Sequence, residues 1–187
     1  PEGLNARSVF YCAQSFRDQG GKYLVDALQW YSKYMTLRTS WFEEEYEALL
    51  NIARCKIRLN DMPSLGYTFS LENIEEDYLK AIRIIEDRAE AYWWLGKLYN
   101  HNKKFQKGYD ILTKGKAVSL ENAQNKYRLF IMHQQYEKWF NDELSVACYW
   151  LGKKEEGLRL IAEVISDPDH ILSRKHYQTN LEHFNNL

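Results

Sequence analysis

Apolar residues recur every three or four positions along almost the whole chain, which is the spacing of amphipathic α-helices. No segment shows the sustained alternation or the Val- and Ile-rich runs that indicate a sheet. The pattern predicts helices of about 12 to 20 residues. Turn-forming positions interrupt it at 20–21, 37–39, 60–69, 87, 102–103, 120–123, 151–152 and 167–168. Helices of this length joined by short turns favour antiparallel pairs, so we predict an all-α protein of helical hairpins.

The clearest internal repeat begins with an aromatic-x2-Leu-Gly-x2-Tyr run, the first-helix pattern of a tetratricopeptide repeat (TPR). Tyr92, Leu95, Gly96 and Tyr99 carry this run, and a second small residue, Gly108, follows Gly96 after twelve positions. Two helices of a hairpin cross closely only where the side chains at the crossing are very small. The spacing therefore predicts a TPR-like hairpin, in which enlarging either glycine would overpack the crossing.

Three further hairpins carry the same pair of small positions with decreasing regularity. The one at 138–166 is clear, the one at 5–38 has a turn two residues longer, and the one at 40–87 is degenerate because bulky Ile74 stands at its second small position. The predicted structural small positions are Ala13, Ala27, Ala53, Gly96, Gly108, Ser145 and Gly157.

We therefore predict a TPR-like α-solenoid of about four hairpins, forming one domain over residues 1–187. A capping helix at the C-terminal end is expected because a terminal repeat cannot bury both of its faces alone. The predicted parts are hairpins 5–38, 40–87, 88–120 and 138–166, an insertion at 121–137 and a capping helix at 169–186.

Net charge, apolar runs and cysteine content limit the compartments and the classes of partner that fit this chain. The formal net charge is −1, so no overall positive field attracts nucleic acid or an acidic membrane surface. No run approaches the roughly 18 apolar residues of a membrane helix, so we expect no membrane span. Cys12, Cys55 and Cys148 are odd in number, far apart and inside helix-like runs, which predicts buried free thiols in a reducing compartment. We expect a cytoplasmic protein with no nucleic-acid partner.

Five blocks resemble a particular group of TPR regions more closely than hairpin packing alone requires. These blocks are ARSVFYCAQSFRDQG (6–20), ALQWYSKY (27–34), EEEYEALLNIARC (43–55), AEAYWWLGKLY (89–99) and DELSVACYWLGKKEEGL (142–158). With them, the chain resembles the TPR region that follows the catalytic domain in certain family 2-like glycosyltransferases of bacteria and large DNA viruses. The resemblance implies a nucleotide-sugar-dependent transferase domain upstream, and Pro1 in place of an initiator Met also suggests a fragment. The long loop at 60–73 departs from that group.

Sequence motifs for catalysis or metal binding are few, and each is better explained by a structural role. Asp167-Pro168-Asp169 has the Asp-x-Asp spacing of metal-dependent glycosyltransferases, but it lies between helices, where Asp169 is better placed as a helix cap. Ser40 and Glu43 have capping-box spacing. The histidines, for which we expect structural or exposed roles, are His101, His133, His170, His176 and His183. We therefore predict no catalytic residue, metal or cofactor, and we expect that any enzymatic activity belongs to the parent protein.

One surface remains as a candidate ligand groove. In a TPR stack the first helix of each hairpin lines the concave face, which here would be both basic and aromatic. The residues expected there are Arg7, Phe10, Gln14, Arg17, Arg54, Arg58, Trp93, Lys97, Asn100, Tyr149 and Trp150. Guanidinium groups pair with anions and aromatic faces stack on apolar groups, so an acidic peptide or a glycan would fit. The alternative is that the aromatic residues pack inside the hairpins and the arginines are solvated.

The predicted function is a non-catalytic protein-interaction or scaffolding module, including self-association, at the C-terminal part of a glycosyltransferase. An accessory glycan- or acidic-peptide-binding module is the second hypothesis, and a self-sufficient enzyme is the third. The two-carboxylate clamp of chaperone-binding TPRs is disfavoured because Phe10 and Gln14 stand where that clamp needs Lys and Asn.

Overall fold

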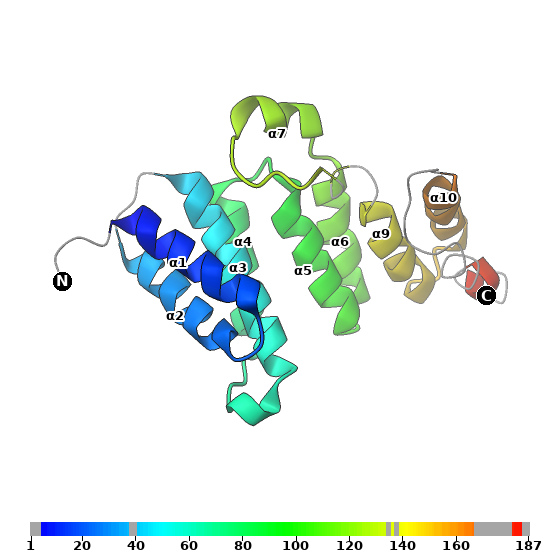
Figure 1. Ribbon diagram of the computed structural model, residues 1–187. Coiled ribbons are helices and arrows are strands. Elements are labelled where there is room, and N and C mark those ends of the chain that lie inside the picture. Colours follow the sequence, from blue (N-terminus) through cyan, green and yellow to red (C-terminus); the bar gives the residue numbers. More distant parts are fainter. Residues whose placement is uncertain (1–4, 38–40, 134–135, 137–138, 167–180, 185–187) are drawn as a thin grey trace. The chain divides into compact units, whose positions relative to one another are not determined.

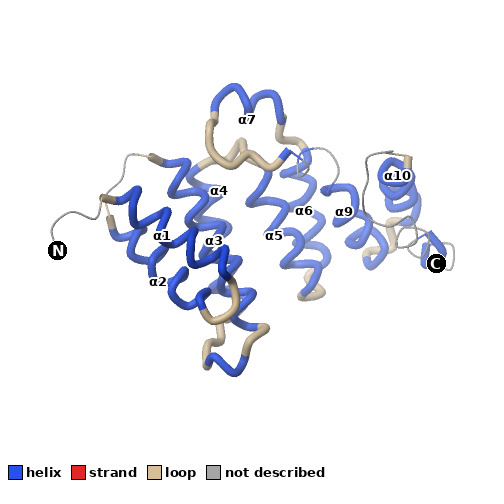
Figure 2. Tube along the Cα trace, viewed as in Figure 1, coloured by secondary structure: helices blue, strands red, loops and turns tan. Residues whose placement is uncertain are grey.

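The structure is a computed structural model that describes residues 5–37, 41–133, 136, 139–166 and 181–184 (Figure 1). In these ranges all regular secondary structure is helical, as Figure 2 shows, and the prediction of an all-α fold is confirmed. The chain divides into two compact units. The first unit comprises Pro1–Glu86 with Tyr127–Phe130, and the second comprises Asp87–Lys126 with Ile131–Leu187.

The first hairpin of the first unit pairs α1 (Ala6–Gln19) with α2 (Tyr23–Thr36). The side chain of Asn5 caps α1 by accepting the backbone N–H of Ser8 at 2.8 Å. The helix ends at Gly20, whose φ of 67° lies in the left-handed region that glycine adopts without steric cost. The predicted turn at 20–21 is therefore present, and the helices on either side of it pack together.

The second hairpin of the first unit pairs α3 (Phe42–Asn60) with α4 (Leu71–Ile84). A short 3₁₀ turn, η1 (Pro63–Leu65), lies in the loop between them. Ser70 caps α4 by accepting the backbone N–H of Asn73 at 3.2 Å. The long predicted loop thus separates two helices that pack against each other.

The contact between α3 and α4 contains a bulky residue and a charged pair. Ile74 is buried, with 3% of its surface exposed, at the place where a regular repeat has a small residue. Lys56 donates from Nζ to Asp77 Oδ2 at 2.5 Å, and both side chains are buried. Burial raises the pKa of Asp77, and the hydrogen bond from Lys56 opposes that rise. The contact between α3 and α4 therefore includes a buried ion pair beside the bulky Ile74.

The second unit contains two further hairpins. The first pairs α5 (Ala89–His101) with α6 (Phe105–Lys116), and the second pairs α9 (Trp139–Trp150) with α10 (Lys154–Ile165). Helix α9 also packs against α6. Gly152, with a φ of 69°, forms the turn between α9 and α10.

The predicted insertion at 121–137 begins with a short helix, α7 (Leu120–Lys126). The predicted break at 120–123 falls inside this helix and was therefore wrongly placed. The hydroxyl of Ser119 accepts the backbone N–H of Asn122 at 3.3 Å, so the sequence Ser-x-x-Asn starts a helical turn here rather than ending one.

The carboxylate of Glu43 binds a segment far along the chain, and its predicted capping box with Ser40 stays a prediction. Its predicted partner, Ser40, lies outside the described residues. The Glu43 carboxylate is 5% exposed in relative area and accepts the backbone N–H groups of Arg128 and Leu129, each at 2.8 Å. The first turn of α3 therefore binds the segment 127–130, because a buried carboxylate must find donors and two backbone N–H groups supply them.

Most of the predicted capping helix at 169–186 lies outside the described residues. The part that is described, residues 181–184, is helical. The Asp167-Pro168-Asp169 motif, His170 and His176 lie outside them as well. Since each unit is described by itself, the single domain over 1–187 stays a prediction. Across the described helices, none has both the length and the apolar character needed to cross a membrane.

Candidate functional site

The predicted arginines of the first unit lie around a buried amide. Asn51 is fully buried, and its Nδ2 donates at 2.9 Å to the backbone oxygen of Glu47 and at 2.9 Å to the Glu47 carboxylate. Its Oδ1 accepts from Arg17 Nη1 at 2.8 Å and from Arg54 Nη1 at 3.4 Å. Arg17 also donates to Asp18 from Nε at 3.0 Å and from Nη2 at 2.7 Å. Asn51 therefore positions two guanidinium groups, and the carboxylates of Asp18 and Glu47 neutralise part of the charge of Arg17.

The thiol of Cys55 lies in the field of these arginines without becoming a nucleophile. Burial raises its pKa to about 11, and the charges of Arg17, Arg58 and Arg54 only partly oppose that rise. Burial likewise raises the pKa of Cys148 to about 11. Both thiols are free and protonated at neutral pH, which is the state of inert buried cysteines. Cys12 is also free but only partly buried.

Phe10 does not lie on a ligand-accessible surface. Its side chain is fully buried, with ring centroids 5.4 Å from Tyr34 and 5.9 Å from Tyr31. Helix α1 packs on both α2 and α3, so its inner face is wider than that of a helix with one neighbour. The expectation that Phe10 faces a ligand is therefore corrected: it belongs to the core. Gln14 is half-buried, and Arg58 is exposed.

Three predicted ligand residues of the second unit instead join its hairpins. Trp93 is buried and donates from Nε1 to the backbone oxygen of Trp139 at 3.0 Å. Asn100 is buried and donates from Nδ2 to the backbone oxygen and the carboxylate of Glu143, at 2.9 and 3.1 Å. Lys97 Nζ lies 3.6 Å from Glu143 Oε1 and 4.9 Å from the centre of the Trp93 ring. These contacts correct the expectation of a ligand role for Trp93 and Asn100, whose side chains are buried and whose N–H donors are already bound within the unit.

The predicted small positions lie where a larger side chain has no room. A Cβ on Gly96 would be 2.3 Å from Leu112 Cγ, and a Cβ on Gly108 would be 2.4 Å from Asn100 Oδ1. A Cβ on Gly157 would be 2.2 Å from Phe184 Cζ. The other four small residues, all buried, are Ala13, Ala27, Ala53 and Ser145.

Tyr149 and Trp150 lie at a pocket in the second unit. The pocket has a volume of about 310 Å³ and is lined by Ser145, Val146, Tyr149, Trp150, His183 and Phe184. The Tyr149 ring stands nearly perpendicular to those of Trp150 and Phe184, at 84° and 87°, with centroids 5.3 and 5.4 Å apart. Trp150 is 61% exposed and stacks on Phe105, with centroids 5.1 Å apart and an interplanar angle of 8°. The walls are therefore aromatic, and stacking on Phe105 orders the exposed indole.

The pocket contains a few polar side chains that could bind a ligand. Its polar side chains are the Ser145 hydroxyl, the Tyr149 hydroxyl and the His183 imidazole, and Ser145 already donates to the backbone oxygen of Asp142 at 2.7 Å. No group of three or more His, Cys, Asp or Glu side chains in the described part of the chain could hold a metal ion. Aromatic walls with a few polar groups suit the recognition of an apolar or aromatic group.

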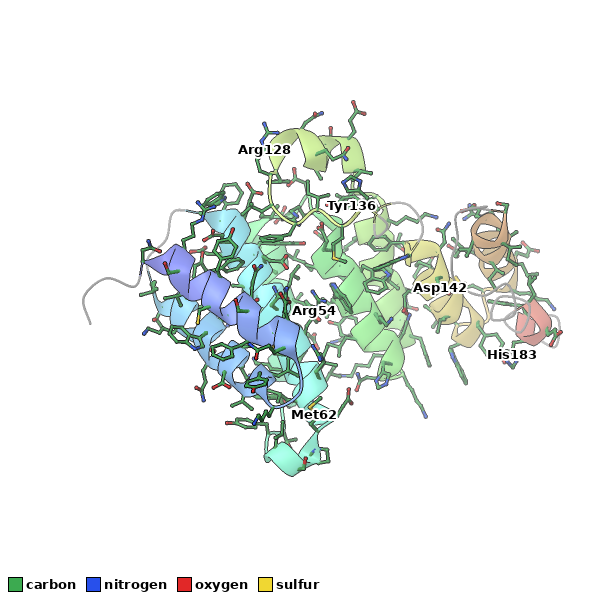
Figure 3. All side chains as sticks on the ribbon, in the orientation of Figure 1. Arg54, Met62, Arg128, Tyr136, Asp142 and His183 are labelled. Atoms are coloured by element: carbon green, nitrogen blue, oxygen red, sulfur yellow. The ribbon has the colours of Figure 1, made fainter. Side chains whose placement is uncertain are left out.

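Only one side of this pocket was predictable from the sequence. Tyr149 and Trp150 were predicted from their place on the first helix of a hairpin. His183 (labelled in Figure 3) and Phe184 come from residues 181–184, which were expected only to cap the last repeat. The sequence shows His183 and Phe184 as two adjacent aromatic residues in an amphipathic segment. No local pattern indicates that these two residues face α9. Whether the remaining predicted residues share one groove across four hairpins stays a prediction.

Antiparallel helix pairs with very small residues at their crossings define the fold class as a TPR-like α-solenoid, in agreement with the sequence prediction. The chain is similar to the solved structure of nearly identical TPR-like repeats ascribed to a kinesin light chain of Podosopora anserina. The similarity covers 98% of this chain and 96% of that one, with a TM-score of 0.60 and 16% sequence identity. No protein-family model matches the sequence, and no curated protein matches it either.

Proposed function

We propose that the chain is a non-catalytic module that binds a protein or peptide partner through the pocket on α9. The observation that carries the proposal is Trp150, an indole that is 61% exposed at the mouth of an aromatic pocket. Tryptophan is enriched among the residues that dominate protein interfaces, where an aromatic anchor fills a pocket on the partner or forms one. The TPR-like fold supports this role by its architecture, because such repeats present helix faces for binding.

The expected bound group is an apolar or aromatic side chain that enters between Tyr149 and Trp150. The perpendicular rings offer both faces and edges, and aromatic pairs favour edge-to-face contacts with centroids about 4.5 to 7 Å apart. The His183 imidazole and the Tyr149 hydroxyl would fix the orientation of the neighbouring peptide backbone. Burial raises the pKa of Cys55 and of Cys148 to about 11, so neither thiol is a ready nucleophile, which supports binding rather than nucleophilic catalysis.

The same proposal includes a parent protein, a family 2-like glycosyltransferase in which this module follows the catalytic domain and positions it. It is supported by the five sequence blocks, of which DELSVACYWLGKKEEGL contains both Tyr149 and Trp150. Sequencing the reading frame upstream of Pro1 tests this part. A transferase domain there agrees with the proposal, and a frame that opens directly before Pro1 contradicts it.

Selection from a random peptide library tests the pocket. The full chain is the target, and peptides that also bind the Trp150→Ala chain are removed. We expect a pool of Trp150-dependent peptides that share an apolar or aromatic anchor, with binding weakened about tenfold or more in the variant.

A matched control uses Tyr23→Ala, which removes another aromatic ring that is exposed (37%) and stacked, in that case on Phe16. Binding of the selected peptides should survive this change. The proposal fails if no Trp150-dependent peptide is recovered. It also fails if free oligosaccharides bind in a Trp150-dependent way while peptides do not, because that result favours the glycan hypothesis, or if the chain alone turns over sugar nucleotides.

A further inference from the structure

A second aromatic surface lies in the first unit, and sequence reasoning assigned only one of its residues to ligand binding. We define it as the Arg7 surface, formed by Arg7, Tyr11, Trp41, Phe42, Tyr127, Arg128 and Phe130. Three of its rings are exposed to an unusual degree: Tyr11 by 41%, Phe42 by 46% and Phe130 by 38%. Large aromatic side chains are normally buried, so their concentration on one face indicates an interaction surface.

Side-chain contacts connect these residues, and the buried Phe10 ring lies between two of them, with its centroid 5.5 Å from that of Tyr11 and 6.1 Å from that of Phe130. The Arg7 guanidinium lies over the Trp41 ring at 5.1 Å and over the Tyr11 ring at 5.7 Å. The Phe42 and Tyr127 rings meet edge to face, with centroids 6.2 Å apart. Segment 127–130 is fixed to α3 by the Glu43 carboxylate, as described above, so its side chains belong to the same face (Arg128 is labelled in Figure 3).

The exposed charged side chains of this surface are arginines, although α3 begins with three glutamates. Glu43 is buried against backbone N–H groups. Glu44 is 2% exposed and accepts the hydroxyl of Tyr34 at 3.3 Å. Glu45 is half-buried, whereas Arg7 and Arg128 are both exposed. Arg7 Nε lies 3.9 Å from the buried Glu44 Oε1, so this carboxylate neutralises part of its charge, although the Arg7 side chain stays 58% exposed. The charged groups that face solvent among the aromatic rings are therefore the guanidinium groups of Arg7 and Arg128.

Phe130 holds its exposed ring at a conformational cost. Its φ is 56°, in the left-handed region that a bulky residue rarely adopts, and its ring centroid lies 6.1 Å from that of Phe10. Such strain persists where the surrounding structure over-determines the conformation, often at functional sites. Here the two hydrogen bonds to Glu43 fix the preceding residues and turn Phe130 onto the surface.

We infer that the Arg7 surface binds an acidic segment of a partner protein that also carries aromatic side chains. Charge complementarity selects the acidic partner, since Arg pairs with carboxylates in bidentate geometry, and Glu44, which contacts Arg7 only at Nε, 3.9 Å away, leaves the exposed side of the guanidinium group open to a partner carboxylate. The exposed rings select aromatic side chains, because Tyr, Phe and Arg are the residues that enrich interface centres. The Arg7 surface and the pocket on α9 share no residue, so the inference about one can fail while the proposal about the other holds.

Binding of a synthetic acidic polypeptide that also carries aromatic side chains tests this inference. The full chain is titrated with a random copolymer of glutamate and tyrosine, and in parallel with a copolymer of lysine and tyrosine of the same length. We expect the acidic copolymer to bind and the basic one not to bind. Binding should weaken about tenfold in Arg7→Ala and in Phe130→Gly, and it should weaken as salt is raised.

Two controls locate the effect. Arg83→Ala, on α4, removes an arginine with the same side-chain exposure as Arg7, 58% in each case, and should leave binding unchanged. Trp150→Ala should also leave it unchanged. The inference is overturned if the acidic copolymer does not bind, if the basic one binds equally well, or if Arg7→Ala binds like the parent chain. Arg7→Ala alone decides the outcome should Phe130→Gly fail to fold.

Discussion

Gly96 shows how a single residue determines the contact between α5 and α6. A Cβ at this position would lie 2.3 Å from Cγ and 2.4 Å from Cδ2 of Leu112. Leu112 is fully buried, so it has no solvent-filled space into which it can move. A side chain as small as a methyl group therefore requires one of the two helices to shift.

We predict that Gly96→Ala lowers the free energy of unfolding by about 1–3 kcal/mol through overpacking, although alanine is the better helix former. The measurement is urea unfolding, read as a lower midpoint at an unchanged slope. Lys114→Ala, at an exposed position of α6, should stay within about 0.5 kcal/mol of the parent chain. A Gly96→Ala protein as stable as the parent would show that the crossing is looser than described.

Glu143 is the buried acid that joins α5 and α9, and its titration affects stability. Burial raises its pKa in the folded chain, and the hydrogen bond from Asn100 and the charge of Lys97 only partly oppose that rise. The folded chain thus holds the Glu143 proton more tightly than the unfolded chain does. The contribution to stability is fully present below the unfolded pKa and is lost as pH rises through the folded pKa.

Glu143→Gln mimics the protonated carboxyl group without titrating. We predict that this variant is more stable than the parent chain at neutral pH, and that the difference shrinks as pH falls through the folded pKa of Glu143 toward the ordinary range of a glutamate. Urea unfolding at a series of pH values measures it. A difference that does not change with pH, or a less stable variant, would mean that the ion pair with Lys97 outweighs the cost of burial.

At the scale of elements, buried carboxylates hold the irregular segment after α7. In the second unit, Glu90 is fully buried and accepts from Arg88 Nε at 3.1 Å and Nη2 at 2.9 Å. It also accepts the backbone N–H of Met132 at 3.0 Å and the hydroxyl of Tyr136 at 3.1 Å, and Tyr136 is labelled in Figure 3. One carboxylate therefore connects the start of α5 with residues that follow it by more than 40 positions.

We predict that Glu90→Ala lowers the free energy of unfolding by about 3–5 kcal/mol, because it leaves the Arg88 charge buried without its partner. The exposed pair of Arg83 and Glu76, at 2.7 Å, is the control, and Glu76→Ala should cost less than about 1 kcal/mol. Equal losses in thermal or urea unfolding would contradict the structural role of the buried pair.

The helices were predictable because their signals are local, whereas several contacts were not. The turn at 20–21 and the crossing residues Gly96 and Gly108 follow from spacing alone. Glu43 has capping-box spacing, yet its carboxylate binds a backbone N–H 85 positions away, and no local pattern contains that information. Phe10 was expected on a ligand face because helical periodicity does not show that α1 has two packed neighbours.

At the scale of the whole molecule, the TPR-like fold brings residues from distant parts of the sequence into two candidate binding surfaces, one in each unit. Half of the pocket on α9 was predictable, since Tyr149 and Trp150 follow from the repeat alignment. Its other wall was not, because the position of residues 181–184 depends on tertiary packing against Gly157, where Phe184 takes the space that a Cβ would need. The proposed binding role therefore rests on tertiary geometry that the repeat pattern does not specify.

The central claim is that the aromatic pocket of the second unit binds a peptide. The most direct measurement is a chemical-shift map of the isotope-labelled full chain, recorded with a peptide from the Trp150-dependent pool. The account predicts that the largest changes fall on Ser145, Val146, Tyr149, Trp150 and residues 181–184. Changes confined to other residues, or no change at saturating peptide, would contradict it.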